Sequence, residues 1–276
     1  MSVGKLTRFG LPFANVVATG TATNQVTPGR TLELLQLKMG GTFTKAMITL
    51  FKLKANGRTL IEASGTEIDK INAYRGVTIN AAFLDIPFFD EKMFSQLDRS
   101  VSAFDTSNGV ANITTEVTIA GATSPTLTPI VVESSAQKDT TGNAAPYSAL
   151  VGKILRYPFS IANGGTLPIT VPFGAASGAI IKRMHVISTG GLQTGATVKQ
   201  DGMVVHESLK ADNDNMQVRS GRVPQALTYT IDFCADGNIR NALDTRDARS
   251  LEWLLTFSAA DNGIVLVEYL DALGNL

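Results

Sequence analysis

The sequence contains little of what most enzymes and metalloproteins require. It has one cysteine, Cys234, and two histidines, His185 and His206, in 276 residues. A single cysteine forms no internal disulfide and no cysteine-rich zinc site, and its place after an apolar strand pattern predicts a small buried residue. Two scattered histidines, each predicted to be an ordinary strand residue, do not make a catalytic constellation. The sequence therefore predicts no enzyme and no required cofactor.

Nucleotide-binding and nucleophile motifs are also missing. No glycine-rich loop is followed by Lys-Ser or Lys-Thr, and no Gly-x-Ser-x-Gly elbow occurs. The first absence argues against a phosphate-binding loop, and the second against a serine hydrolase of the common α/β type.

An excess of charge of one sign and a long apolar run are both absent. Lys plus Arg number 24 and Asp plus Glu number 24, so the net charge suggests no direct nucleic-acid partner, which usually needs a basic face. The charged fraction of 17% lies below the usual value of about 25% and suits a protein that packs against neighbours. No apolar run reaches the ~18 residues of a membrane span, and no signal-peptide run follows the N-terminus.

What the sequence does contain is an internal repeat. Residues 54–88 align with residues 199–233 without a gap at an offset of 145. Such a match predicts a duplicated structural unit. The identical pairs are Lys54 and Lys199, Gly57 and Gly202, Glu62 and Glu207, Asp69 and Asp214, Gly76 and Gly221, Ala81 and Ala226, Ile86 and Ile231, and Phe88 and Phe233.

The flanking segments set the expected boundaries. Residues 5–9 (KLTRF) align with residues 153–157 (KILRY) at an offset of 148. We expect the copies to close with residues 111–119 and 263–270, pairing Glu116 with Glu268 and leaving residues 250–257 as an insertion. The Thr-, Ser- and Gly-rich stretch 121–148 predicts a connection, although residues 129–132 could extend a strand. The predicted domains are residues 1–135, with a connection at about 121–152, and residues 153–276.

Local patterns predict an all-β fold. Asn56-Gly57 and Asp201-Gly202 predict tight hairpins, residues 66–74 and 211–218 predict a helical turn or a structured loop, and Asp90 and Asp236 are expected to begin short helices. The remaining segments give about eight short strands per copy, which is typical of a sandwich. Eight strands in each of two copies predict two tandem eight-stranded jelly rolls, which together form a double jelly roll.

Acidic clusters raise the question of a metal. Asp212 and Asp214, in the run Asp-Asn-Asp-Asn, carry oxygen ligands of the kind that calcium prefers. The run lacks the spacing and distal glutamate of an EF-hand loop, which favours a solvated turn. Asp90-Glu91 and residues 244–247 are similar weak candidates.

Residues 210–214 (KADND), 227–233 (LTYTIDF) and 267–269 (VEY) resemble the major capsid protein of corticoviruses, tailless phages with an internal membrane. The N-terminal half resembles it more loosely, at the Pro-Gly before residues 30–37 and at residues 56–58 (NGR). The resemblance implies a double jelly-roll subunit of the lineage that includes adenovirus hexon.

What that lineage implies for function is a structural role in the virion. Subunits of this kind form pseudo-hexagonal homotrimers that tile an icosahedral shell around a lipid membrane and a double-stranded DNA genome. The implied partners are neighbouring trimers, vertex and membrane proteins and the membrane surface, with assembly in the host cytoplasm. The family is also associated with calcium.

Two alternatives stay open at this stage. A tandem β-sandwich that binds carbohydrate or a receptor needs exposed aromatic residues, and the single tryptophan, Trp253, lies in a strand pattern. Lys5 and Arg8 either face the membrane, where basic residues meet anionic head groups, or Arg8 belongs to the first strand as Arg156 does in the second copy.

Overall fold

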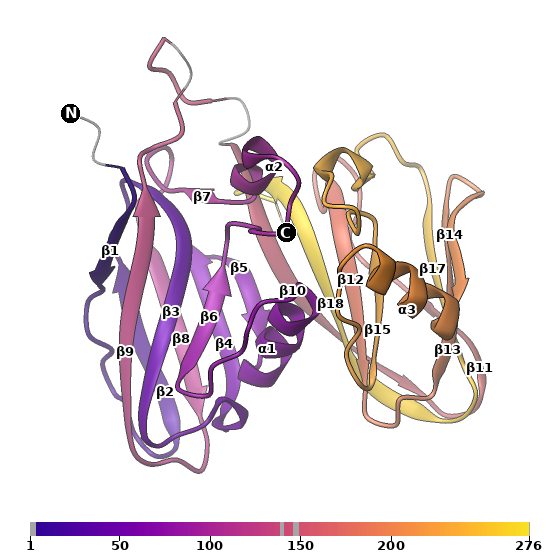
Figure 1. The fold of residues 1–276 in the computed structure, drawn as a ribbon, viewed down its shortest axis with the longest axis horizontal. Helices are drawn as coiled ribbons and strands as arrows, with labels where there is room; N and C mark the ends of the chain where they lie inside the picture. The colour runs from indigo at the N-terminus through magenta and orange to yellow at the C-terminus, as the bar shows by residue number, and fades with distance from the viewer. Residues whose placement is uncertain (1–3, 139–140, 146–148, 276) are drawn as a thin grey trace.

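The structure, a computed structural model, describes residues 4–138, 141–145 and 149–275. It consists mainly of β-strands in three sheets, which build two sandwiches side by side along the longest axis of the molecule (Figure 1). Within the described residues, no helix is long and apolar enough to cross a membrane. The predicted all-β double jelly roll with short helices in its loops is confirmed.

The first roll contains two facing sheets. Alternation of burial along a strand builds its core, because successive side chains point to opposite faces; β8 buries every second residue. Apolar side chains from both sheets form one cluster, which includes Leu35, Phe51 and Val117. One sheet has the order β1 (Leu6–Phe9), β9 (Thr123–Ser134), β3 (Thr31–Thr42) and β6 (Phe83–Pro87), with β7 (Phe104–Asp105) on β3; the facing strands are β5 (Arg58–Ala63), β4 (Ile48–Ala55), β8 (Ile113–Ile119) and β2 (Gly20–Val26).

The second roll repeats this order strand for strand. Its core is a separate apolar cluster that includes Trp253 and Val267. One sheet has the order β10 (Leu150–Ile161), β18 (Asp261–Ala272), β12 (Ile180–Ser188) and β15 (Thr228–Asp232), with β16 (Leu243–Asp244) on β12; the facing strands are β14 (Met203–Leu209), β13 (Gln193–Gln200), β17 (Leu251–Phe257) and β11 (Gly165–Ile169).

The predicted hairpin turns are confirmed. Asn56 and Gly57 join β4 to β5 with φ angles of 49° and 78°, and Asp201 and Gly202 join β13 to β14 with 51° and 80°. Two consecutive residues with positive φ match the right-handed twist of the flanking strands, which is why Asn-Gly and Asp-Gly favour this turn.

The polar stretches after the hairpins are helices. α1 (Gly65–Tyr74) and α3 (Lys210–Arg219) have the same length and differ by the repeat offset of 145. α1 begins with a capping box, in which Ser64 accepts from the backbone N–H of Glu67 and Glu67 accepts from that of Ser64. This cap satisfies backbone donors at the first turn of α1, whereas the N-cap residue of α3, Leu209, makes no side-chain cap hydrogen bond. A 3₁₀ turn, η1 (Lys45–Met47), precedes β4.

The expected helix starts at Asp90 and Asp236 are wrong. α2 (Gln96–Val101) begins later, with Ser95 as its N-cap, and η3 (Ile239–Asn241) has Asn238 as its N-cap. Asp90 is 2% exposed; its Oδ2 accepts from Arg183 and its Oδ1 accepts from the backbone N–H of Lys92, which closes a turn and begins no helix. Asp236 accepts a hydrogen bond from the backbone N–H of Asn238, which closes a turn ahead of η3.

The predictions for the strands that close each copy of the repeat also need correction. The stretch 123–134, expected to lie in a connection in which residues 129–132 could extend a strand, is entirely the twelve-residue strand β9, which pairs with both β1 and β3. Residues 250–257, expected to be an insertion, contain β17, the counterpart of β8. Leu6 lies opposite Glu133 and its repeat partner Ile154 lies opposite Glu268. The counterpart of Glu268 is therefore Glu133 and not Glu116.

Two glycines with similar backbone angles allow a matched prediction. Gly41 in β3 has φ +75°, and a Cβ there would lie 2.1 Å from the carbonyl oxygen of Ser124; Gly57 has φ +78° with no atom within 4 Å of such a Cβ. We expect Gly57→Ala to lower the free energy of unfolding by about 1 kcal/mol and Gly41→Ala by about 2–3 kcal/mol, because only the second adds a backbone clash. Urea unfolding of both variants measures the difference, and equal losses would contradict this account.

Candidate functional site

The two rolls meet along a joint between β5 and β10. These edge strands run parallel with Ile61 opposite Ile154, so one sheet of each roll continues into the other as a nine-stranded sheet. Beside the strands, the guanidinium of Arg156 on β10 binds the carboxylate of Glu67 on α1, with Nε 3.3 Å from Oε2. The joint thus combines strand pairing with an ion pair from a helix to the neighbouring roll.

A cluster of buried charged side chains fills the space behind the joint. The first roll contributes side chains from the end of α1 and from the loop after β6, and the second roll contributes them from β12, β15, β18 and the segment after α3. Its members are Tyr74, Arg75, Asp90, Lys182, Arg183, His185, Arg222, Asp232 and Glu268, and none of these side chains is more than 6% exposed. We call these residues the inter-roll cluster.

Arg183 lies at the centre of the inter-roll cluster. Its Nη1 donates to Asp90 Oδ2 at 2.9 Å and to Glu268 Oε2 at 3.2 Å, and its Nε lies 2.9 Å from Asp232 Oδ2. Asp90 belongs to the first roll, whereas the other carboxylates belong to the second. Arg75 of the first roll binds the same oxygen of Glu268, with Nη2 donating to Oε2 at 2.6 Å. Each roll therefore supplies counter-charges that the other roll needs.

His185 has a structural role in the same cluster. Its Nε2 lies 2.8 Å from Glu268 Oε1 and its Nδ1 lies 3.0 Å from Thr230 Oγ1. The ring packs edge-on against Tyr74 of the first roll, with centroids 5.3 Å apart, and the Tyr74 hydroxyl donates to Asp232 at 3.0 Å. Both ring nitrogens thus bind protein groups, in agreement with the predicted ordinary strand role.

The electrostatics of the inter-roll cluster keep the carboxylates of Glu268 and Asp90 ionised. Burial alone would raise the pKa of Glu268, but Arg75, Arg183, His185 and Lys182 outweigh it and hold that pKa well below its usual value. The pKa of Asp90 is lowered in the same way: burial raises it, and the surrounding cations more than reverse the effect. The pKa of Lys182 moves down, mainly because burial disfavours its charge. Ionised carboxylates next to fixed guanidinium groups make a joint that depends on charge pairing.

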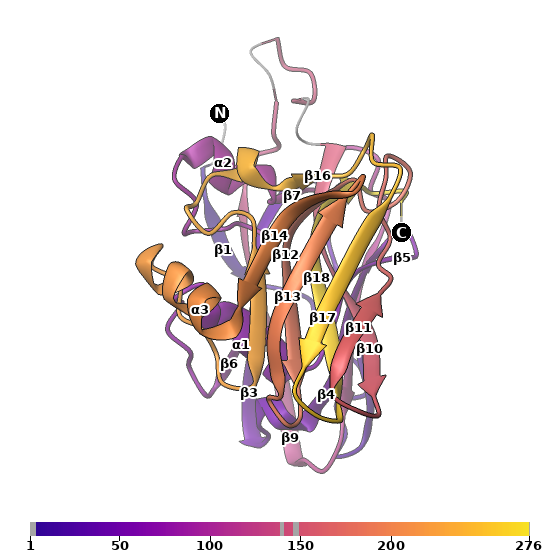
Figure 2. The same ribbon diagram turned by 90° about the vertical axis from the view of Figure 1, so that its right-hand side faces the viewer.

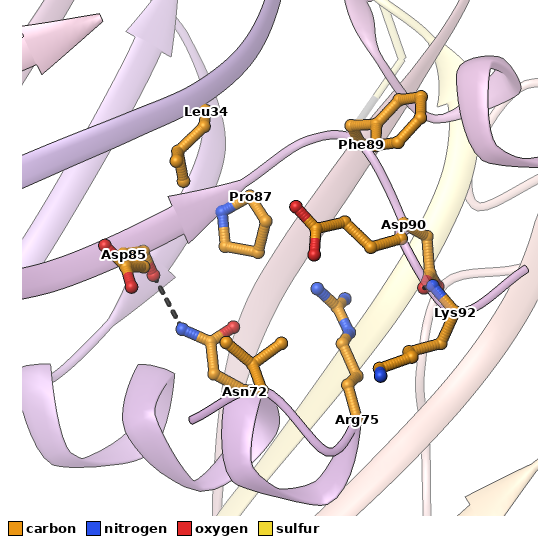
Figure 3. A pocket seen from close by; sticks show the side chains of 10 residues that line it. Leu34, Asn72, Arg75, Asp85, Pro87, Phe89, Asp90 and Lys92 are labelled. Carbon is orange, nitrogen blue, oxygen red and sulfur yellow. Dashed lines mark hydrogen bonds between the residues drawn. The ribbon is translucent and has the colours of Figure 1, made fainter. Parts of the chain in front are cut away.

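A small cavity opens beside the cluster on the first roll (Figure 3). Arg75 and Asp90 lie toward one end of it, and Asn72 and Asp85, joined by a 2.7 Å hydrogen bond from the Asn72 amide to the Asp85 carbonyl, lie toward the other. Its volume is about 70 Å³, whereas pockets for drug-sized ligands usually span about 300–1,000 Å³. The space suits water molecules at the joint more than an organic ligand.

Several strands of the described chain end a sheet and so have a neighbour on one side only, and β1 and β14 are two of them. β1 ends the five-stranded sheet of the first roll and β14 ends the four-stranded sheet of the second. They lie at opposite ends of the longest axis (Figure 1), and Figure 2 shows β14 and α3 on the end face of the second roll. Phe9 on β1 is 71% exposed, and Met203 and Leu209 on β14 are 72% and 64% exposed. Free edges with exposed apolar side chains are typical of interaction sites.

Of the acidic calcium candidates, Asp212 and Asp214 both lie on α3, and Asp90 and Asp244 lie elsewhere in the chain. Asp212 is exposed on α3, and Asp214, two residues further on, pairs with Lys210 at 2.9 Å. Residues two apart on a helix do not face each other. In the described ranges, the structure groups no three His, Cys, Asp or Glu side chains for a metal. Asp90 belongs to the inter-roll cluster, and Asp244 pairs with Arg246. Calcium binding stays a prediction.

The remaining predicted residues are engaged in ordinary packing. Lys5 pairs with Glu33 at 3.0 Å, and Arg8, within β1, binds the buried carboxylate of Glu133 through two nitrogens. The strand role of Arg8 is therefore confirmed. Cys234 is buried, and burial raises the pKa of its thiol to about 12, which makes it an unreactive core residue. His206 lies 3.4 Å from the Tyr229 hydroxyl.

Sequence reasoning missed most of the inter-roll cluster. One local signal was present, because Lys182 and Arg183 interrupt the otherwise apolar run of β12. Adjacent charges inside a strand, one on each face, place at least one charge against buried surface and require a partner there. The partners themselves, Asp90, Asp232 and Glu268, lie on other elements far along the chain.

Comparison with known families decides the identity. The family described as "Viral coat protein P2 N-terminal domain" matches residues 9–138 of this chain. The family described as "Viral coat protein P2 C-terminal domain" matches residues 151–273. The chain belongs to the viral coat protein P2 family. It is thus a structural protein of the virion capsid, as the sequence predicted, and not an enzyme. A search of curated protein sequences finds no match.

Solved structures share the fold of this coat protein. The major capsid protein P2 of bacteriophage PM2 superposes with a TM-score of 0.85 at 19% identity, covering 97% of both chains. A chain of Sulfolobus turreted icosahedral virus gives 0.71 at 15% identity, covering 98% of this chain and 91% of that one. The capsid of the virus PBCV-1 gives 0.63 at 10%, covering 98% and 94%. The double jelly roll is common to all three.

Proposed function

We propose that three copies of this coat protein close into a ring of pseudo-hexagonal outline, and that these trimers tile an icosahedral shell. The observation that carries the proposal is the pair of free strands, β1 and β14, at opposite ends of a molecule whose halves are joined edge to edge. An interface between two different surfaces of one subunit repeats head to tail and closes into a ring when the rotation permits.

The internal repeat explains why the ring would contain three copies. Each copy supplies two similar rolls, so a trimer presents six similar outer faces and can tile a shell in a hexagonal pattern. The corticovirus-like residues imply the same number. Pairing of β1 with β14 at each contact would also cover edges that otherwise promote uncontrolled association.

The remaining partners follow from the family resemblance. We expect the shell to enclose a lipid membrane and to contact vertex and membrane proteins, with assembly in the host cytoplasm. The balance of 24 basic and 24 acidic residues supports a shell that lipid separates from the genome. The Lys5–Glu33 and Arg8–Glu133 pairs neutralise the basic N-terminal segment, so we assign the membrane contact to no particular residue.

Native mass spectrometry of the purified protein tests the trimer. We expect the mass of three chains at micromolar concentration. Leu209→Asp should shift the population to monomers, because a carboxylate on β14 would have to be desolvated at the contact. Phe94→Asp is the matched control, since Phe94 is 86% exposed but lies on neither free strand, and it should stay trimeric. A stable wild-type monomer would contradict the proposal.

A further inference from the structure

The internal repeat relates the joint within one chain to the two free strands. β14 is the counterpart of β5 at the offset of 145, and β1 is the counterpart of β10 at the offset of 148. In the folded chain β5 and β10 pair in parallel with Ile61 opposite Ile154. At these offsets Ile61 corresponds to His206 and Ile154 corresponds to Leu6. The free strands are therefore the same two surfaces that already bind each other once.

We propose that β14 of one copy pairs in parallel with β1 of the next, with His206 opposite Leu6. This inference rests on the proposed ring and specifies its interface. The joint between copies would then reproduce the joint between rolls, and the four-stranded sheet of one copy would continue into the five-stranded sheet of its neighbour.

The burial of the two counterpart strands supports this assignment. In β5, Leu60 and Ile61 are 0% and 2% exposed, because β4 and the second roll cover them. At the equivalent places in β14, Val205 is 38% exposed and His206 is half-buried. The strand has seven residues where β5 has six and keeps the equivalent pairing partner, β13 in place of β4, but it lacks a covering roll. A roll of a second copy would supply that cover.

An ion pair provides a second, independent correspondence. Glu67, the third residue of α1, binds Arg156 across the joint. Its counterpart is Asp212, the third residue of α3, and the counterpart of Arg156 is Arg8. Asp212 is exposed, and the Arg8 side chain is 40% exposed while holding Glu133 on one side. A guanidinium has enough N–H groups to bind a second carboxylate, so we assign Asp212 to Arg8 of the neighbouring copy.

The proposed joint between copies would not reproduce the inter-roll cluster. Arg75, which reaches Glu268 of the second roll, corresponds at the offset of 145 to Ser220. The joint between copies would therefore lack that arginine of the joint between rolls. It would rely on strand pairing, apolar cover and the Asp212–Arg8 pair, which suits an interface that must form after the chain has folded.

Cysteine cross-linking tests the register. In a Cys234→Ala background, Leu6→Cys with His206→Cys should give covalent trimers under mild oxidation, because Cα atoms on neighbouring strands are separated by a distance that a disulfide can span. Leu6→Cys with Met203→Cys is the control, since Met203 lies three residues, about 10 Å, along the strand. Faster cross-linking of this control pair would overturn the register.

The outcomes of these experiments distinguish the proposed pairing of β14 with β1 from the proposed ring of three copies. A trimer by native mass spectrometry without cross-linking of the Leu6–His206 pair would overturn the pairing and leave the proposed function intact, whereas a monomer would overturn both.

Asp212→Arg should raise the dissociation constant of the trimer about fivefold, the range of an exposed ion pair. Asp247→Arg, at another exposed acidic position, should not change it. An unchanged constant for Asp212→Arg would overturn the assigned ion pair.

Discussion

Replacing Arg183 with methionine is expected to lower the free energy of unfolding by about 3–5 kcal/mol, the range for breaking a buried ion pair. Arg183 is 0% exposed and lies within 3.2 Å of Asp90, Asp232 and Glu268. Without the guanidinium these carboxylates stay buried and repel one another. Urea unfolding at pH 7 and fixed protein concentration measures the loss, because association of copies would add to the apparent stability.

The control is Arg246→Met, which removes an exposed pair. Arg246 and Asp244 are 58% and 48% exposed, and pairs of this kind contribute about 0–1 kcal/mol. Adding Asp232→Asn to Arg183→Met should recover part of the lost stability, since the penalty comes from the uncompensated carboxylates. A loss below about 1 kcal/mol for Arg183→Met would show that the inter-roll cluster does not hold the rolls together.

Acid is expected to unfold the protein steeply below about pH 4, where unfolded Asp and Glu side chains begin to take up protons. The pKa values of Asp90 and Glu268 are lowered in the folded protein, because the surrounding cations outweigh the effect of burial. Groups with lowered folded pKa values stabilise the fold above their unfolded pKa. That stabilisation is lost as the pH falls toward the folded values, since the unfolded chain then binds more protons.

Glu268→Gln provides the sharpest measurement of this effect. At pH 7 it should cost about 3–5 kcal/mol, because Arg75 and Lys182 lose their counter-charge. The difference from the wild type should shrink by about 1.4 kcal/mol per pH unit below pH 4, as the wild-type glutamate must also be neutralised. Glu252→Gln, at an exposed position of β17, should follow the wild type at every pH. A difference that is constant between pH 7 and pH 3 would exclude Glu268 as a source of the acid sensitivity.

The joint between the rolls links stability to assembly. Its strand pairing and its helix-to-strand ion pair involve residues with counterparts on β14, β1 and α3, whereas the contact of Arg75 with Glu268 has no such counterpart. In the proposed assembly, one chain thus contains a strongly fixed version of the contact and the two halves of a weaker one. A shell subunit needs both, because the rolls must not separate while copies must still associate.

Features that depend on a few adjacent residues could be predicted well. The turns at Asn56-Gly57 and Asp201-Gly202 follow from backbone preferences of neighbouring residues, and the repeat at an offset of 145 correctly paired β5 with β14 and α1 with α3. Where insertions changed the offset, sequence matching failed, as in the pairing of Glu268 with Glu116. Only the register against β1 and β10 identifies Glu133 as the counterpart.

By itself the sequence determined the duplication, the all-β class, the absence of a catalytic constellation and the resemblance to a capsid family, because each of these is carried by local patterns or by one-dimensional matches. Only the tertiary structure decided that residues 123–134 form the strand β9, that Asp90 binds Arg183 instead of beginning a helix, and that Arg75 reaches Glu268 across the joint. The physical reason is that a buried charge is stabilised by whichever counter-charge the fold brings to it. That partner is set by the packing of two rolls and leaves no mark at a fixed spacing along the chain.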